Sequence, residues 1–461
     1  MCGVNWPTRR IRLVLGTGLF CCLRPPARCG SVISFERKAW NVPHYENQLV
    51  RQLPYGLADL FFEQAAAKTE LERILQATFR QWGYGRIIPP TFQYYETLAT
   101  QASPQLKEEM YRFFDREGHI LALRPDMTVP TARLVGTKLY DQTLPLRFYY
   151  VGNVFRYEEP QAGRRREFTQ AGIELIGAAT PEADAEVVAV AIAALEAMDI
   201  GRFQINLGQV AFLAAILGDA RLSQGDLGRL ERAIERKNDV ELQRMLEELG
   251  IAGNAACAIR AIPRLCGDQG VLREAQRLAT NRAARLAVEH LGRVYHLLCT
   301  KGLAEHITLD LGEVRGMGYY TGITFHGYVA GLGSYICGGG RYDGLIAHFG
   351  ADLPAVGFAL GVERSMLVTR LDVDFAPDIV MQACEHQTCG ALVAMARSRG
   401  LCVEVDVLGR RGKELVAYAR GRGARQAIFC RDASTYTVAD SHASRRMGLP
   451  ELQEELASWN R

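Results

Sequence analysis

The sequence has little net charge of either sign. Its 461 residues include 54 lysines and arginines against 51 aspartates and glutamates, which gives a formal net charge of +3. A protein that attracts nucleic acid or a membrane through its overall field usually carries a larger excess of one sign. The composition therefore gives no support for an RNA-binding protein, and tRNA binding is not expected.

The N-terminal region lacks an apolar run of membrane-spanning length. Arg9, Arg10 and Arg12 precede the stretch LVLGTGLFCCL, which is shorter than the roughly 20 residues that cross a bilayer. RPPARCG follows it in place of a clear cleavage site. We expect residues 1–50 to be a disordered extension or the result of a mis-assigned start, with a signal or transit peptide as the alternative. No membrane association is expected.

The 12 cysteines lack paired C-x-x-C units and form no framework of a small secreted domain. This pattern favours reduced thiols and a cytoplasmic location. The best metal-like group is Cys384, His386 and Cys389, but its spacing is not usual for zinc and no second half follows nearby. Ordinary buried thiols and no metal site are therefore expected. The triple glycine at 338–340 is no P-loop either, because the lysine and its spacing are missing, so no cofactor is predicted.

The most distinctive stretch of the chain runs from Phe155 to Ile176. The segment LRFYYVGNVFRYE is rich in β-branched and aromatic residues, and after a break near Pro160 the extended pattern resumes as EFTQAGIELIG, which predicts a β-hairpin. The connecting loop gathers four arginines: Arg156, Arg164, Arg165 and Arg166. Guanidinium forks suit phosphate or carboxylate. The loop is thus either an anion site or a solvated loop, and three adjacent arginines alone favour the solvated loop.

Alternate residues of the second predicted strand share one face of the sheet. Gln170, Gly172 and Glu174 therefore line one side, and the glycine is expected to leave an open floor between an amide and a carboxylate. Such a floor suits a small ligand with an ammonium or imidazole group, because amide and carboxylate oxygens accept N–H hydrogen bonds. A polar face turned toward water is the alternative, and this strand alone does not decide between them.

The order of the elements predicts an α+β fold. An amphipathic helix over about 61–82 precedes the hairpin, and the region of about 220–305 has the pattern of a helical insertion. After residue 371, strands alternate with helices. We therefore expect a main domain at 51–371 that contains the insertion, and a small α/β C-terminal domain at 372–461.

A glycine-rich block follows the predicted insertion. Glycine within strands often marks a close approach of backbone or ligand. Here Gly316, Gly318 and Gly322 lie next to aromatic and basic residues. The block therefore predicts a binding wall, with these side chains: Arg315, Tyr319, Tyr320 and Arg341.

Five motifs together resemble those of the class II histidyl-tRNA synthetase family. They are LRPDMT, FRYEEPQAGRRREFTQAGIE, VRGMGYYTG, GGGRYDGL and VGFALGVER. They follow the family order from about residue 53 to 371, and this shared order is more specific than any single motif. The resemblance implies a class II aminoacyl-tRNA synthetase-like antiparallel sheet flanked by helices, with a helical insertion and a small C-terminal domain.

The resemblance also implies two groups of site residues. The residues implied to surround a histidine pocket are Asp126, Thr128, Gln170, Glu174, Tyr319 and Tyr320. The residues implied to lie on the adenylate side are Arg156, Arg166, Arg315 and Arg364, of which Arg315 matches the catalytic arginine of the synthetases. Free histidine carries an ammonium, an imidazole and a carboxylate, which these groups can complement.

Two departures from the synthetase pattern point to a relative of that family. The synthetase sequence RGLDYY reads RGMGYY here, so Gly318 removes a carboxylate from the pocket wall. The insertion also lacks the arginine, leucine, aspartate, cysteine and lysine signature of the synthetases. Both features are similar to those of the ATP phosphoribosyltransferase regulatory subunit family. This resemblance implies a protein without catalytic residues that assembles with the short-form catalytic subunit, binds histidine as effector and permits feedback inhibition of histidine biosynthesis.

This regulatory interpretation is our leading hypothesis, with the arginines as a vestigial nucleotide or anion side. A homodimer built on residues 61–90 is expected, joined to catalytic dimers. An active histidyl-tRNA synthetase is the alternative, and the presence of Arg156, Arg315 and Arg364 favours it because amino-acid activation needs cations at the α-phosphate. A free-standing class II amino-acid ligase is a third, less favoured interpretation.

Overall fold

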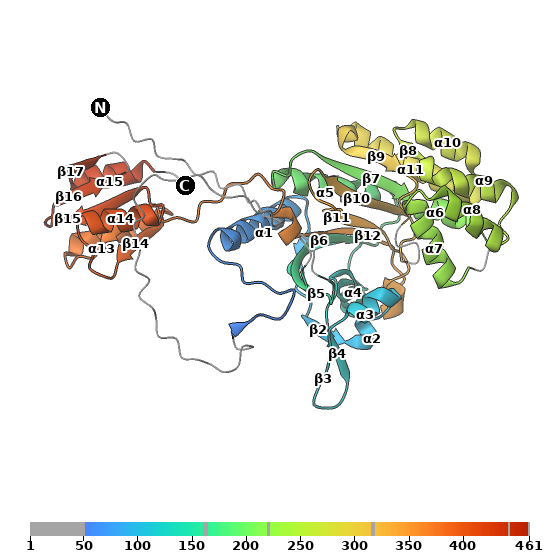
Figure 1. Cartoon of the computed structure of the whole chain (residues 1–461), viewed down its shortest axis with the longest axis horizontal. Coiled ribbons are helices and arrows are strands. Elements are labelled where there is room, and N and C mark those ends of the chain that lie inside the picture. The colour runs from blue at the N-terminus through green and yellow to red at the C-terminus, as the bar shows by residue number, and fades with distance from the viewer. Residues whose placement is uncertain (1–50, 160–164, 219–221, 315–318, 441–442, 460–461) are drawn as a thin grey trace, which may run out of the picture. The chain divides into compact units, whose positions relative to one another are not determined.

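The chain folds into two compact units that divide between Asp372 and Val373 (Figure 1). The computed structural model describes residues 51–159, 165–218, 222–314, 319–440 and 443–459. The predicted extension at 1–50 and four residues of the predicted site region, Arg164, Arg315, Gly316 and Gly318, lie outside the described residues. No helix among the described residues is long and apolar enough to cross a membrane.

The N-terminal unit is built on a nine-stranded sheet. Its strands, in spatial order, are β1 (Gly85–Arg86), β5 (Leu146–Phe155), β6 (Glu167–Ile176), β12 (Ala355–Gly361), β11 (Cys337–Arg341), β10 (Ile323–Val329), β7 (Phe203–Gln209), β9 (Ile307–Asp310) and β8 (Cys266–Gly267). Two pairs are parallel, β1 with β5 and β7 with β9, and the other neighbours are antiparallel. The predicted arginine hairpin is present as β5 and β6, which pair along their full lengths.

Helices α1 (Glu63–Gln81) and α5 (Pro181–Ala197) pack on one face of this sheet. The apolar residues Leu71, Leu75 and Phe79 follow helical spacing, so α1 buries one stripe and leaves its polar side in solvent. Helix α5 starts at the N-cap Thr180, whose hydroxyl accepts from the Ala183 N–H. Because its residues are apolar nearly all round, α5 is buried between the sheet and α11.

The opposite face of the sheet carries a smaller layer. A three-stranded sheet is formed by β2 (Phe92–Tyr94), β4 (Ile120–Leu123) and β3 (Arg112–Phe114), in that spatial order. Short helices accompany it: α2 (Tyr95–Leu98), α3 (Pro104–Glu109), α4 (Thr128–Leu134) and the π-helical turn η2 (Val135–Leu139). The short helix α12 (Val362–Ser365) lies instead beside α1, where Glu363 pairs with Lys68. Residues of α4 and β6 share a core with Tyr342. The layer therefore covers the face of β6 that carries the predicted polar residues.

The expected helical insertion is present between β7 and β9. Its helices are α6 (Val210–Leu217), α7 (Gln224–Glu235), α8 (Asp239–Glu248), α9 (Gly253–Ala261), α10 (Gly270–Leu278) and α11 (Arg282–Thr300), with short turns η3 (Ile262–Arg264) and η4 (Ala304–His306). Apolar residues of these helices join the core of the large sheet. The expected α+β fold with its helical insertion is thus confirmed.

The C-terminal unit contains a five-stranded sheet. The strands, in spatial order, are β14 (Val403–Asp406), β13 (Ile379–Gln382), β15 (Gln426–Cys430), β16 (Thr435–Ala439) and β17 (Ser444–Gly448). Helices α13 (Gln387–Ser398) and α15 (Leu449–Ala457) pack on one face and α14 (Lys413–Gly421) on the other. The alternation of β13, β14 and β15 with α13 and α14 matches the pattern expected after residue 371, whereas the antiparallel hairpin of β16 and β17 was not predicted.

Candidate functional site

The two faces of β6 have different environments, as the alternating pattern predicts. Ala171, Ile173 and Leu175 are buried in the main core beneath α1 and α5. Because alternate residues point to opposite faces, Gln170 and Glu174 lie on the other face, and both are buried there. The alternative of a polar face turned toward water is therefore wrong.

The expectation of an open floor at Gly172 is also wrong. Gly172 pairs with Tyr150 of β5, and a Cβ at Gly172 would lie 2.8 Å from the Tyr150 hydroxyl and 2.2 Å from the Phe358 carbonyl oxygen. The glycine is needed because β12 and the tyrosine approach the strand so closely. The space above it is therefore occupied by a phenol that hydrogen-bonds to the neighbouring carboxylate.

Glu174 lies at the centre of a tyrosine cluster. The Tyr150 hydroxyl donates to Oε1 of Glu174 at 3.1 Å, and the Tyr342 hydroxyl donates to Oε2. Glu174 is 1% exposed, and Gly357 on β12 lets its carboxylate lie against the strand, since a Cβ there would meet Oε2 at 1.8 Å. Both oxygens of this buried carboxylate are thus held in fixed positions by neighbouring side chains.

Asp126 and Thr128 join this cluster at the start of α4, and Gln170 of β6 contacts the same turn. Gln170 accepts a hydrogen bond from the Met127 N–H at 2.9 Å through its Oε1, and Asp126 accepts from the Val129 N–H at 3.1 Å. Thr128 forms a side-chain hydrogen bond with Glu174. The Asp126 carboxylate therefore satisfies an N–H of the first turn of α4, and it also faces Glu174 closely enough for the two carboxyls to repel each other.

The two predicted tyrosines complete one side of the cluster. Tyr319 stacks on Tyr342 with ring centroids 5.5 Å apart, and its ring meets that of Tyr320 edge to face at 5.1 Å. Burial, then the charge on Glu174 and then that on Asp126 raise the pKa of Tyr319 well above its ordinary value. The structure therefore brings together all six predicted pocket residues.

Burial dominates the electrostatics of the two carboxyls. It raises the pKa of Glu174 from 4.5 to about 7, although hydrogen bonds from Tyr342, Thr128 and Tyr150 oppose the shift. Burial likewise raises the pKa of Asp126, and Arg156 opposes it. Burial raises these pKa values because it penalises the charged form, and raised values of this kind are common at functional sites. A ligand ammonium or imidazolium placed here would favour the ionised carboxylates.

The described arginines hold different positions around the cluster. Arg156 donates from Nε to the Pro125 carbonyl oxygen at 2.8 Å and lies 3.6 Å from a Glu158 oxygen, so it borders Asp126. Arg364 donates to the Tyr335 carbonyl oxygen at 3.1 Å. Arg166 instead stacks over Tyr157, with its guanidinium carbon 3.7 Å from the ring centroid. Arg156 therefore borders a pocket carboxyl, Arg364 contacts Tyr335, and Arg166 holds the base of its own loop.

Arg341, which the sequence placed in the binding wall, has a structural partner. Its guanidinium donates to Asp184 of α5 at 2.6 Å and to Asp343 at 3.0 Å. Asp184 is fully buried, so removing one partner of this pair would leave an uncompensated charge. Arg341 therefore fixes β11 to α5.

Comparisons with known proteins identify the family to which this chain belongs. The histidyl-tRNA synthetase family model matches residues 56–364. A protein of Moorella thermoacetica described as an ATP phosphoribosyltransferase regulatory subunit is 41% identical over 380 residues, which are 82% of this chain and 97% of that protein. A protein of Geobacter sulfurreducens with the same description is 38% identical, over 80% of this chain and 86% of its own length. The chain belongs to the ATP phosphoribosyltransferase regulatory subunit family.

Solved structures of other proteins have a similar fold. One from Bacillus halodurans, described as an ATP phosphoribosyltransferase regulatory subunit/histidyl-tRNA synthetase, matches with a TM-score of 0.72 and 30% identity, covering 82% of this chain and 98% of that one. The histidyl-tRNA synthetase of Nostoc matches with a TM-score of 0.73 at 22% identity, covering 88% of this chain and 98% of that one. The second likeness is evidence for the fold alone. The class II synthetase-like fold expected from the motifs is thus confirmed.

Two members of the cluster were missed by sequence reasoning. Tyr150 lies opposite Gly172 on β5, and Tyr342 directly follows Arg341 in GGGRYDGL. The signal for Tyr342 was present, since this motif was already among those that carry the resemblance. For Tyr150 the signal was the register of the hairpin, which places a phenol over the glycine between Gln170 and Glu174.

Proposed function

We propose that this chain is the non-catalytic regulatory subunit that a short-form ATP phosphoribosyltransferase requires, and that it carries feedback inhibition by histidine. The observation that carries the proposal is the buried carboxyl of Glu174 beside the half-buried carboxyl of Asp126 in a chain of this family. The cluster offers acceptors for two cationic groups, and free histidine has an ammonium and an imidazole. Arg156, at the border of Asp126, is placed to meet the histidine carboxylate.

Inhibition then works as a coupling free energy between two sites. Histidine binds one arrangement of the hetero-oligomer more tightly, and the catalytic subunit is less competent in that arrangement. Within this subunit, the start of α4 links the proposed histidine site to the rest of the fold. Asp126 and Met127 belong to the turn before α4, and Gln170 accepts a hydrogen bond from Met127 of that turn. A ligand that reorients these groups also moves α4.

We further propose that the subunit forms a homodimer through the region before β2. Large apolar side chains are exposed there, including Phe61 at 62%, Phe62 at 60% and Ile88 at 77%. The neighbouring β1 is an edge strand of the large sheet. An exposed edge beside an apolar patch is a surface that proteins normally cover, and a second copy of this chain covers it in the proposed assembly.

An active histidyl-tRNA synthetase is the second candidate, because the chain has the cations Arg156, Arg315 and Arg364 that amino-acid activation requires, and Arg156 borders Asp126 of the cluster. Gly318, in place of the aspartate of the synthetase motif, argues against it. The two functions are separated by two assays on the purified full-length chain.

The first assay mixes the chain with a short-form ATP phosphoribosyltransferase and measures product formation with and without histidine. We expect activity that depends on both chains and is inhibited by histidine. The second assay measures histidine-dependent exchange of pyrophosphate into ATP by the chain alone, where we expect no exchange. Failure of the first assay together with exchange in the second would replace the regulatory proposal by the synthetase.

A further inference from the structure

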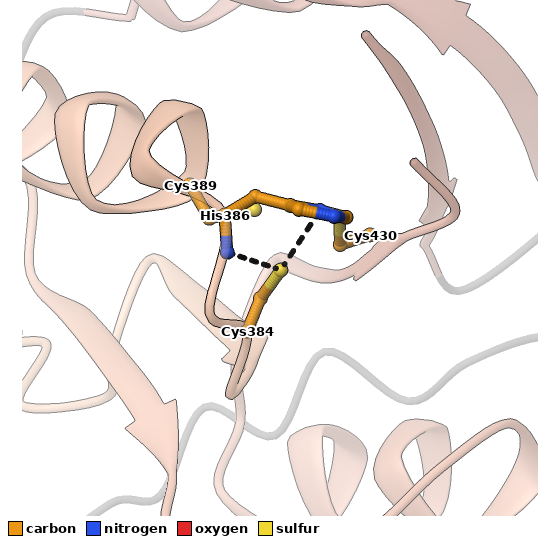
Figure 2. A group of neighbouring side chains, drawn as sticks. All are labelled: Cys384, His386, Cys389 and Cys430. Carbon is orange, nitrogen blue, oxygen red and sulfur yellow. Dashed lines mark hydrogen bonds between the residues drawn. The ribbon is translucent and has the colours of Figure 1, made fainter. Parts of the chain in front are cut away.

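The C-terminal unit brings three thiols and one imidazole to a single point. Figure 2 shows the side chains of Cys384, His386, Cys389 and Cys430 directed toward one another. Their ligand atoms all lie within 4.8 Å of one another. From the sequence no metal site was expected at Cys384, His386 and Cys389, because their spacing is not usual for zinc and no second half follows nearby. In the fold, Cys430 joins these three residues as a fourth potential ligand.

The fold explains how a distant cysteine reaches this group. Cys384 and His386 lie in the connection after β13, Cys389 lies in the first turn of α13, and Cys430 ends β15. Strands β13 and β15 are parallel neighbours, with Met381 paired to Ile428. The carboxyl ends of the two strands therefore meet at the same edge of the sheet, and the four side chains converge there.

The distances fit a tetrahedral metal ion. His386 Nδ1 lies 3.4 Å from Cys384 Sγ and 3.3 Å from Cys430 Sγ. Zinc bonds of about 2.3 Å to sulfur and about 2.0 Å to nitrogen place tetrahedral ligands ~3.5–3.8 Å apart. A small contraction or expansion of the cluster would bring all four atoms to bonding distance of one ion. Soft thiolates with one imidazole favour zinc over magnesium or calcium.

Two groups other than the four ligand atoms contact the cysteine sulfurs. The His386 backbone N–H points to Cys384 Sγ at 3.4 Å, and the Tyr436 hydroxyl lies 3.7 Å from Cys389 Sγ. Hydrogen bonds of this kind orient and stabilise metal ligands. A disulfide explains the cluster less well, because it would join two of the three thiols and leave the third thiol and the imidazole without a reason to converge.

We propose that the C-terminal unit binds one zinc ion through four ligands: Cys384, His386, Cys389 and Cys430. The three cysteines bind as thiolates and release their protons to solvent on binding. With four protein ligands the coordination is closed, so the ion has a structural role. It fixes the connection between β13 and α13 to the end of β15.

Metal analysis of the full-length chain, purified under reducing conditions and supplied with zinc, tests the proposal. We expect about one zinc per chain, and at least about tenfold less in Cys430→Ser, because loss of one of four ligands opens a closed site. Cys402→Ser is the matched control, since Cys402 is an exposed cysteine of the same unit outside the cluster. It should retain the zinc of the unaltered chain.

Cobalt(II) substitution in the unaltered chain keeps the test independent of how the variants fold. We expect the intense visible absorption of tetrahedral cobalt with thiolate charge-transfer bands, and its loss on addition of zinc. The proposal is overturned by an unaltered chain that binds neither ion, by equal zinc in Cys430→Ser and Cys402→Ser, or by an iron chromophore in place of zinc.

Discussion

The Tyr150 hydroxyl donates a hydrogen bond to Oε1 of Glu174 at 3.1 Å, across the β5–β6 hairpin. This contact fixes a buried carboxylate, a hydrogen-bond acceptor, on the polar face of β6. With Tyr342 on the other oxygen, the carboxylate is held in one orientation before any ligand binds, which lowers the entropic cost of binding.

Replacing Glu174 by glutamine should weaken histidine binding. The amide keeps the shape of the side chain but removes the charge, and a hydrogen bond to a charged group contributes about 1.5–3 kcal/mol, or roughly tenfold to a hundredfold in affinity. Isothermal titration calorimetry at pH 8, where Glu174 is ionised, measures the loss. The exposed Glu159→Gln is the control and should bind histidine as the unaltered chain does. Equal affinities for Glu174→Gln and the unaltered chain would refute the placement of the ligand cation.

The stability of the unaltered chain should fall with rising pH relative to Glu174→Gln. Below pH 4.5 the carboxyl is protonated in both folded and unfolded chains. Between 4.5 and about 7 the unfolded chain releases this proton while the folded chain keeps it, so the free energy of unfolding decreases across this window and levels off above it. Urea unfolding at a series of pH values measures the difference between the two proteins. Asp126 is present in both, so parallel curves would show that Glu174 does not carry the raised pKa.

Tyr342→Phe should extend the upper limit of that window to higher pH. The phenol donates to the ionised carboxylate, and its removal disfavours the charged form and raises the pKa of Glu174 further. The phenylalanine ring keeps the stacking on Tyr319. The same urea series, with Glu174→Gln added to each background, isolates the shift. Tyr140→Phe, at a residue 60% exposed, should leave the window in place, and a shift of equal size there would contradict the assignment.

Ile88→Glu should convert the proposed homodimer to monomer. A charge in the centre of a buried apolar contact is costly unless it is paired, and Ile88 is 77% exposed in the single chain. Sedimentation equilibrium should show a weaker dimer by at least about tenfold, because burial of a side chain of this size contributes about 1.5–3 kcal/mol. Val240→Glu, on the helical insertion and 82% exposed, should change nothing. A monomeric unaltered chain would exclude the dimer.

The sequence was sufficient for the parts of the site that depend on local pattern. Period-two alternation placed Gln170 and Glu174 on one face of a strand, and the resemblance carried by LRPDMT implied Asp126 as a pocket residue, which lies at the start of α4. It was not sufficient where the outcome depends on strand register or strand order. Whether Gly172 faces open space depends on the residue opposite it, which is Tyr150.

The same limit explains the C-terminal unit. Cys430 lies beside Cys384 only because β15 pairs with β13. The spacing of the cysteines along the sequence does not indicate which strands are neighbours. The hairpin of β16 and β17 was missed because SRRMG is short, polar and largely exposed, so its pairing with TYTVA determines the strand more than its own propensity does.

The most direct test of the regulatory account is a histidine titration of the reconstituted complex. Each complex of short-form ATP phosphoribosyltransferase with the unaltered chain or with Glu174→Gln is normalised to its own activity without histidine. We predict that histidine inhibits the first complex and that the second needs at least about tenfold more histidine for half inhibition. Identical titrations of the two complexes, or no inhibition of the first, would contradict the account.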